Sequence, residues 1–441
     1  MDINVLTLRH PIVLLRLAVR KMLRVLRKEE PVVKAPEPTP VTAPPADDFI
    51  DVRQLIASTS MEALHEKAET YFSSLTDWDH HLAKPFSTVS EAPALLINFA
   101  TMLQGMRLFP GLRVVDFGGG TGWASRYLTQ LGCEVILVDV SKTALDIARE
   151  LYRRHPPIGK RPEPRFLHYN GTRLDLGDES VDRILCFDAF HHATNPDEVI
   201  RDFARVLVPG GIAAFAEPGP HHSKFPNSQF EMRTYGVVEN DVDVHAIWKT
   251  AQEAGFVDIK FAAYNIPPYQ IDLAGYDDLL NGGENYLRWA EFTRYFMRDV
   301  RNFFLKKAGD EPVDSRQTAG LAATIEISMP SQVAAGEKIA VHASITNSGR
   351  ALWLPSAIVP GGVSLGSHLY DGDGKLVTFD HDWQPLSDER TKPGESVTLD
   401  FALPPLAAGS YIIEFDCVSN GVCWFAQMGS RAVRAAVEVK G

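Results

Sequence analysis

The chain has 441 residues, of which 45% are hydrophobic and 23% charged, and a formal net charge of -12. This length exceeds what one compact core supports, so we expect two or three domains of an ordinary soluble protein. The acidic balance argues against nucleic acid as a partner. Four cysteines without a CxxC pair give no zinc-ribbon pattern and suit a reducing, cytoplasmic location.

The segment 1–28 is basic and has helical periodicity. From Pro11 onward, arginines recur on one helical face and apolar residues on another. The segment is too charged to span a bilayer and has no signal-peptide cleavage site. We expect an amphipathic helix whose residues 11–28 contact the inner face of the cytoplasmic membrane. A partner-binding helix and a free basic tail are the alternatives.

Proline-rich residues 29–48 predict a semi-rigid linker. A domain over 49–307 follows, and its first part is helical by the spacing of apolar residues in "MEALHEKAETYFSSL" and "APALLINFATMLQGM".

Between 113 and 217, apolar strands alternate with amphipathic helices. The expected strands are "RVVDF", "EVILVDV", "PRFLHYN", "RILCFDAF" and "GIAAFAEPG". Strands that are apolar throughout are typical of a parallel sheet with helices on both faces. One more helix and strand follow in "VDVHAIWKTAQEAGFVDIKF", and residues 270–307 form a helical extension in this interpretation. The fold class is therefore α/β, with a Rossmann-like, mostly parallel sheet.

A linker over 308–320 separates this domain from a C-terminal one. Residues 321–441 contain short alternating strands divided by Gly, Pro, Asn and Asp, including the turn sequences "DGDG" and "SNG". This pattern predicts an antiparallel, immunoglobulin-like β-sandwich. Its Trp353, Trp383 and Trp424 are candidates for stacking on sugar rings, with burial in the core as the alternative for the first and third.

The stretch "VVDFGGGTGWAS" is the most informative part of the sequence. A dinucleotide fingerprint would need a third glycine where Trp123 stands, which argues against NAD or FAD. The spacing from Asp116 through the glycines instead resembles motif I of the class I S-adenosylmethionine-dependent methyltransferases. The residues concerned are Asp116, Gly118, Gly119, Gly120 and Gly122.

The chemistry of S-adenosylmethionine agrees with this resemblance. Asp116 suits its cationic methionine end, and glycines let the backbone approach without Cβ clashes. Asp139, with Val140 beside it, ends the second strand and is placed to accept the two ribose hydroxyls. A turn or a helix cap is the alternative role for Asp139, although Ser141 is itself a good cap.

The resemblance also implies that the helical segment before the first strand forms a lid over cofactor and substrate, and it implies the remaining cofactor contacts. Residues after the third strand border the adenine in this family, here Asn170, Gly171 and Thr172. Residues after the fourth strand line the methyl-donor pocket, which assigns Phe187 and Asp188 to it.

Candidate catalytic residues follow the fourth and fifth strands. A hydroxyl or amine acceptor benefits from a general base, and histidine has the suitable pKa. The candidates are His191, His192, His221, His222 and Glu217. A polar loop residue or a helix cap is the alternative role for each histidine. Adjacent histidines point apart on a strand and no HExxH spacing exists, so we predict no metal.

The stretch "EPGPHHSKFPNSQFEMRTYGVVENDVD" resembles methyltransferase modules of bacterial polysaccharide and cell-envelope assembly, and the tail resembles sandwich domains attached to that machinery. The resemblance implies O-methylation of a sugar in a surface polysaccharide or its precursor, with a sugar or glycan as partner. The alternatives are a small-molecule, lipid or quinone methyltransferase and a non-catalytic, glycan-binding assembly component. The intact glycine loop and Asp139 argue against the last of these.

Overall fold

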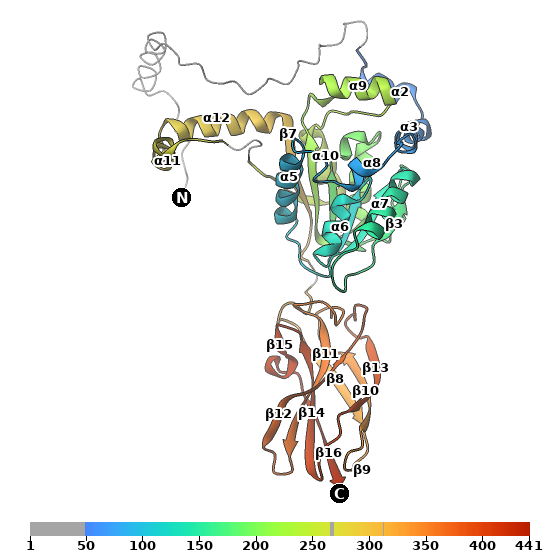
Figure 1. The fold of residues 1–441 in the computed structure, drawn as a ribbon, viewed down its shortest axis with the longest axis vertical. Coiled ribbons are helices and arrows are strands. Elements are labelled where there is room, and N and C mark those ends of the chain that lie inside the picture. The colour runs from blue at the N-terminus through green and yellow to red at the C-terminus, as the bar shows by residue number, and fades with distance from the viewer. Residues whose placement is uncertain (1–48, 265–268, 312) are drawn as a thin grey trace. The chain divides into compact units, whose positions relative to one another are not determined.

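The structure is a computed structural model that describes residues 49–264, 269–311 and 313–441. The predicted basic helix over 1–28 and the linker over 29–48 lie outside the described residues. An α/β domain and a β-sandwich follow one another along the described chain (Figure 1). The predicted fold class is confirmed.

A seven-stranded sheet in the order β3-β2-β1-β4-β5-β7-β6 forms the centre of the α/β domain. Its strands are β1 (Arg113–Phe117), β2 (Glu134–Asp139), β3 (Arg165–His168), β4 (Val181–Phe187), β5 (Leu207–Pro218), β6 (Phe256–Phe261) and β7 (Val300–Lys307). Strands β1 to β5 pair in parallel. The strand order reverses between β1 and β4, and open α/β sheets bind ligands beyond the carboxyl ends of the strands at such a point.

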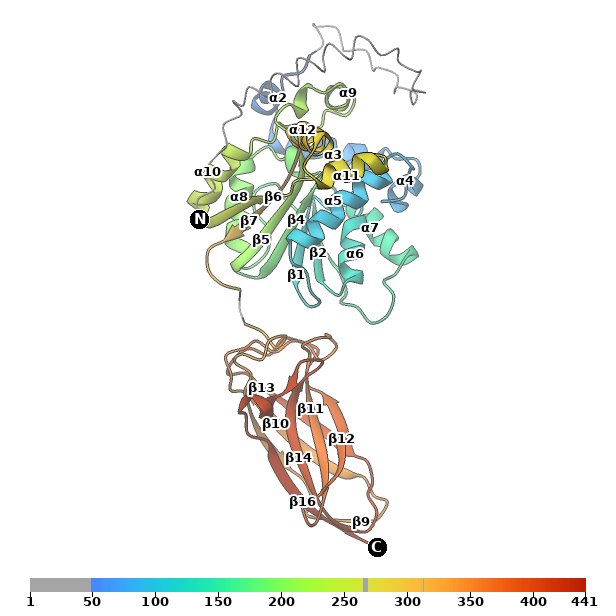
Figure 2. The same ribbon diagram turned by 90° about the vertical axis from the view of Figure 1, so that its left-hand side faces the viewer.

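Helices cover both faces of this sheet. Figure 2 shows α8 (Pro196–Val206) and α10 (Val244–Ala254) on one side, and α5 (Ala92–Gly105), α6 (Trp123–Gln130) and α7 (Lys142–Arg154) on the other. Each set packs its apolar stripe on the buried strands and forms its own hydrophobic core. The other α-helices among the described residues are α2 (Val52–Ser58), α3 (Met61–Ser73), α4 (Asp79–Leu82), α9 (Pro226–Tyr235), α11 (Leu273–Leu280) and α12 (Glu284–Asp299).

The predicted helical extension over 270–307 is wrong for its last part, because residues 300–307 form strand β7 after α12 ends. β7 lies antiparallel between β5 and β6. Phe303 is fully buried and stacks on Phe215 with 4.5 Å between the ring centroids. Aromatic residues fit a pleated, buried surface, so the sheet determines the conformation of this segment.

The β-sandwich consists of two sheets, in the orders β13-β10-β8 and β12-β11-β14-β16-β9. Only β9 pairs in parallel among its described strands, with β16. Trp353 lies in the core, whereas Trp383 is 40% exposed on the outer side. The strands are β8 (Ala323–Ser328), β9 (Gln332–Ala334), β10 (Ile339–Asn347), β11 (Val363–Asp371), β12 (Leu376–Pro385), β13 (Ser396–Leu403), β14 (Gly409–Ser419), β15 (Cys423–Trp424) and β16 (Val433–Lys440).

Candidate functional site

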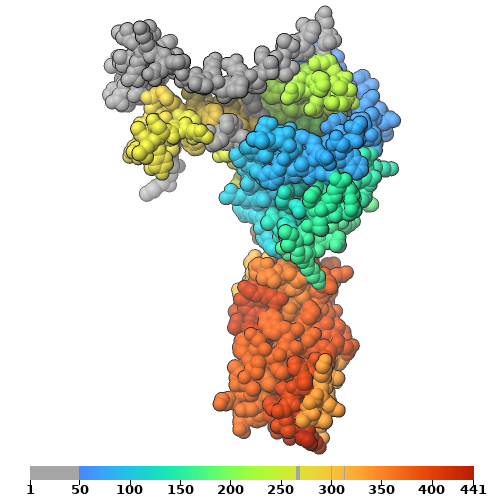
Figure 3. Space-filling model, in the orientation of Figure 1, coloured from blue at the N-terminus to red at the C-terminus, as the bar shows by residue number. Residues whose placement is uncertain are grey.

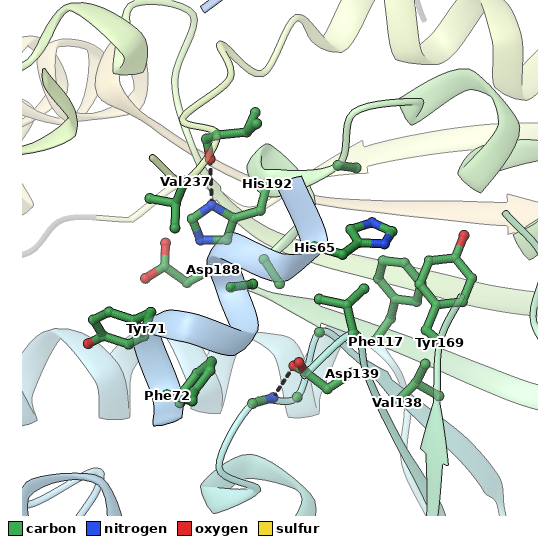
Figure 4. A pocket seen from close by; sticks show the side chains of 18 of the residues that line it. His65, Tyr71, Phe72, Phe117, Val138, Asp139, Tyr169, Asp188, His192 and Val237 are labelled. Atoms are coloured by element: carbon green, nitrogen blue, oxygen red, sulfur yellow. Dashed lines mark hydrogen bonds between the residues drawn. The ribbon is translucent and has the colours of Figure 1, made fainter. Parts of the chain in front are cut away.

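A cavity of about 350 Å³ lies beyond the carboxyl ends of β1, β2 and β4. The glycine loop and the end of β2 line one side of it. The segment after β4 and side chains of α9 line the other, and α3 crosses between them (Figure 4). We call the first side the cofactor end and the second the acceptor end, since the predicted cofactor residues lie mostly at the first.

The glycine loop turns tightly after β1. Gly118, Gly120 and Gly122 have φ angles of 66°, 51° and 82°, which favour glycine. A Cβ on Gly118 would lie 2.5 Å from Cβ of Ala189, so packing inside the protein also excludes a side chain there. A Cβ on Gly120 would meet only Phe72, at 4.0 Å. The backbone of Gly120 is therefore open toward the cavity.

Asp139 lies at the end of β2 and lines the cavity beside Val140. Its Oδ2 accepts a hydrogen bond from the Gly120 N–H at 2.9 Å, and its Oδ1 accepts one from the Ser141 N–H at 2.8 Å. Ser141 in turn caps α7 by accepting from the Ala144 N–H. Burial raises the pKa of Asp139 to about 6. Each carboxylate oxygen keeps a second lone pair for a ligand.

Asp116 does not line the cavity. It is 1% exposed beneath the loop, where its Oδ2 accepts a hydrogen bond from the Ser125 hydroxyl at 2.7 Å. Burial raises the pKa of Asp116 to about 6. The side chain that the sequence placed toward the cationic end of the cofactor instead supports the loop from behind, and Gly122 also lies outside the lining.

Of the predicted adenine-side residues, too, some line the cavity and others do not. Gly171 lines the cavity, and a Cβ on it would lie 2.0 Å from the His65 ring. Asn170 is turned into its own loop, where its side-chain oxygen accepts from the N–H and hydroxyl of Thr172. Tyr169, which the sequence interpretation passed over, lines the cavity next to this loop.

Helix α3, which belongs to the segment predicted to form a lid, lines the cavity with several side chains. His65, Tyr71 and Phe72 reach into it (Figure 4), and the Tyr71 ring packs edge-on against Tyr235 of α9. Figure 3 shows the first helices of the described chain, in blue, against the yellow-green surface of α9. The site is thus covered by two elements, α3 and α9, that lie far apart in the sequence.

Glu69 fastens α3 to the start of α7. Its carboxylate accepts hydrogen bonds from the hydroxyls of Ser141 at 2.7 Å and Thr143 at 2.5 Å. We expect Glu69→Ala to loosen the lid and to weaken S-adenosylhomocysteine binding about fivefold, since such partly exposed charged hydrogen bonds contribute about 1 kcal/mol. Calorimetric titration measures this change. Glu66→Ala, at an exposed position on the same helix, is the control, and an equal loss in both variants would contradict the lid interpretation.

Asp188 and His192 form the acceptor end next to Phe187. Asp188 has a φ of 53°, a conformation that is uncommon outside glycine and that occurs at functional sites. Its side chain is 71% exposed. The His192 Nδ1 donates to the Val238 carbonyl at 2.6 Å, with the ring turned toward Asp188 (Figure 4). Partial burial and the charge of His191 lower the pKa of His192.

The other four catalytic candidates do not line the cavity. His191 is buried behind His192, and its Nδ1 hydrogen-bonds the Glu217 carboxylate at 2.8 Å. Burial lowers the pKa of His191, but the hydrogen bond and the charge of Glu217 outweigh it and raise the pKa to about 9. His222 contacts Glu239 instead, and His221 is exposed outside this group.

Glu239 is a residue that sequence reasoning missed. It is 3% exposed and lies among three histidines, with its Oε2 2.6 Å from His222 Nε2 and 3.9 Å from His191 Nε2, and its Oε1 3.4 Å from His192 Nδ1. It stands within "YGVVENDVD", a loop with no recognisable catalytic spacing. The only available signal was an acid in a stretch that already resembled methyltransferase modules.

Comparison with known proteins agrees with this geometry. Residues 115–215 match the family model described as a methyltransferase domain. Demethylmenaquinone methyltransferase of Renibacterium salmoninarum is 26% identical over 136 residues, which are 30% of this chain and 53% of that protein. The ubiquinone/menaquinone biosynthesis C-methyltransferase UbiE of Vibrio vulnificus is 30% identical over 115 residues, 25% of this chain and 43% of that protein.

A solved structure, that of geranyl diphosphate C-methyltransferase from Streptomyces coelicolor, is 13% identical, with a TM-score of 0.40 over 57% of this chain and 100% of that one. The chain spans about half the length of the curated relatives it matches. In the described part of the chain, no helix has the length and apolarity needed to cross a membrane. Residues 115–215 are therefore similar to a methyltransferase domain, and S-adenosylmethionine is the cofactor that this similarity supports.

Proposed function

We propose that the protein transfers a methyl group from S-adenosylmethionine to a hydroxyl of a sugar in a bacterial surface polysaccharide or its precursor. The observation that carries this proposal is one cavity with an open glycine backbone and a carboxylate at one end and a polar acceptor wall at the other. The two ends adjoin where Gly118 packs on Ala189, so a donor and an acceptor bound in the cavity are neighbours.

The cofactor end fits S-adenosylmethionine. The uncovered Gly120 lets the ligand approach the backbone, and the Asp139 carboxylate on the cavity wall has lone pairs available for the ribose hydroxyls. The bound cofactor supplies an activated methyl group on a sulfonium, so the protein's main task is to align the acceptor oxygen with it. Asp116 contributes by holding the loop.

The acceptor end suits a hydroxyl-rich molecule. Asp188, His192 and Glu231 line it together with Tyr71 and Tyr235, and each offers a hydrogen-bonding group. The hydroxyls of a sugar can form hydrogen bonds with these side chains, whereas a quinone ring has few atoms that can do so. The exposed Trp383 of the sandwich adds a flat face that suits sugar rings. The basic N-terminal segment predicted from the sequence suits a lipid-linked precursor at a membrane.

Quinone methylation is the second candidate, because the first relatives named above are quinone methyltransferases. A transfer assay with labelled S-adenosylmethionine separates the two. Lipid-linked oligosaccharide fractions, free nucleotide sugars and a demethylated quinone are offered in parallel. Label in the sugar fractions supports the proposal. Label only in the quinone overturns the sugar assignment, and absence of label from every acceptor despite cofactor binding overturns it as well.

His192 is the candidate whose replacement is most informative at the acceptor end. We expect His192→Asn to lower kcat at least 100-fold, a size typical of removing a group that acts on the reacting proton or oxygen. S-adenosylhomocysteine affinity should stay within about twofold, because His192 stands on the other side of the cavity from Asp139 (Figure 4). Steady-state kinetics and calorimetry measure the two quantities. His221→Asn is the control, and equal losses in both variants would exclude a special role for His192.

A further inference from the structure

We propose that His191, His192 and Glu239 bind a divalent transition-metal ion at the acceptor end of the cavity. One nitrogen of each histidine and one carboxylate oxygen of Glu239 all lie within 4.8 Å of one another. Ligand atoms around a tetrahedral ion lie about 3.4 Å apart at bond lengths of about 2.1 Å. Small side-chain rotations therefore suffice to bring the three groups onto one ion.

The Glu239 carboxylate has an unused oxygen in this cluster. Its Oε1 is buried and has no hydrogen-bond partner among the described residues, whereas its Oε2 is held by His222. An unpaired carboxylate oxygen shielded from water is costly, and a metal ion is a partner that removes this cost. This oxygen lies on the side of His192, at 3.4 Å from Nδ1.

Glu217 supports the same assignment from behind the ligands. It hydrogen-bonds the Nδ1 of His191 and also accepts from the N–H groups of Ala189 and Phe190. A metal-bound histidine commonly donates a hydrogen bond from its other ring N–H to a carboxylate. This bond orients the ring, and in His191 it leaves Nε2 for the ion. Nε2 of His191 is the nitrogen on the Glu239 side.

Charge balance also favours a cation. The ion pairs of Glu217 and Glu239 in the described residues are all with histidines. Glu217 and Glu239 are both buried, and a divalent ion that displaces the proton from His191 Nε2 would balance the two carboxylates. Two imidazoles and a carboxylate suit Zn²⁺, Mn²⁺ or Fe²⁺ and leave coordination positions open.

The open positions would face the acceptor, because His192 and Val238 line the cavity while His191 lies behind them. This role rests on the proposed function: the ion would hold the acceptor's hydroxyl oxygen beside the methyl donor. Binding would replace the hydrogen bond from His192 Nδ1 to the Val238 carbonyl, since that nitrogen must present its lone pair to the ion. The sequence-based expectation of no metal assumed that the adjacent histidines lie on a strand and noted the lack of an HExxH spacing. The two histidines instead lie in a 3-10 turn, and the fold supplies the third ligand from a distant loop.

The test uses untagged, full-length protein freed of metal by a chelator. It is titrated with Co²⁺, whose visible absorption reports imidazole and carboxylate ligation, and Zn²⁺ is quantified by elemental analysis after dialysis. We expect one equivalent of ion per chain. Glu239→Gln and His191→Asn should each weaken Co²⁺ binding at least tenfold, whereas His221→Asn, an exposed neighbour outside the cluster, should bind as the wild type does.

S-adenosylhomocysteine titration of every variant shows that each is folded. Wild-type protein that binds S-adenosylhomocysteine but no Co²⁺ would overturn the metal site and leave the proposed function standing. Equal Co²⁺ affinity in wild type and Glu239→Gln would overturn it as well. Co²⁺ binding lost in Glu239→Gln, without any methyl transfer, would support the metal site while the proposed function fails. Equal methyl transfer with and without metal would overturn the ion's role in holding the acceptor.

Discussion

Asp139→Ala is expected to weaken S-adenosylhomocysteine binding about 100-fold or more, because the ribose hydroxyls lose two charge-assisted hydrogen bonds to the carboxylate. Asp139 is the carboxylate that ends β2 on the wall of the cavity, whereas Asp116 is turned behind the loop. The variant also loses the bond that Asp139 accepts from the Gly120 N–H, so the loop itself loosens. Calorimetric titration measures the affinity of variant and wild type.

The same carboxylate predicts a pH dependence. Its pKa of about 6 means that Asp139 becomes protonated as the pH falls through 6. A protonated acid accepts fewer hydrogen bonds, so wild-type affinity should fall as the pH drops from 7 to 5, by at most about tenfold per pH unit below the pKa. Asp139→Asn should bind weakly at every pH, without this slope. Ser141→Ala removes the helix cap beside Asp139 and the hydrogen bond to Glu69, so it measures how much of the loss comes from local loosening. Affinity of Asp139→Ala within threefold of wild type would contradict the cofactor assignment.

Glu217→Ala is expected to destabilise the α/β domain by about 3–5 kcal/mol, the usual cost of removing one member of a buried ion pair. Glu217 is 3% exposed and accepts from the N–H groups of Ala189 and Phe190 as well as from the His191 ring. Alanine leaves these donors unpaired inside the protein. Scanning calorimetry should show the unfolding temperature of this domain lowered by about 10 °C or more.

Glu253→Ala removes a carboxylate from a surface ion pair with Arg201 at 3.4 Å, where both side chains are more than half exposed. It should change the stability by less than about 1 kcal/mol. Equal shifts in the two variants would mean that Glu217 is not the anchor of the segment after β4.

The parts of the fold that could be predicted are those with a local cause. Apolar strands followed by amphipathic helices determine the alternation up to β5, and the glycines after β1 mark the tight turn. β7 could not be found in this way. Its residues follow a long helix without a turn signal, and it becomes a strand because β5 and β6 both need a partner.

Within the site, side-chain direction was the part that sequence could not settle. Both Asp116 and Asp139 stand at strand ends, but only Asp139 reaches the cavity. His191 and His192 are neighbours in one short 3-10 turn, which sends the first into the core against Glu217 and the second to the cavity wall. Glu239 joins them from the loop between α9 and α10, and no spacing rule encodes the path of that loop.

The position of β7 has a consequence for synthesis on the ribosome. β6 reaches the sheet only through β7, which is translated more than 35 residues later, after α11 and α12. At about 5–20 residues per second, β5 leaves the ribosome seconds before the strand that covers its edge. An uncovered apolar strand edge pairs readily with other chains. Nascent chains stopped between α10 and β7 should therefore engage chaperones, and those extended beyond Lys307 should release them.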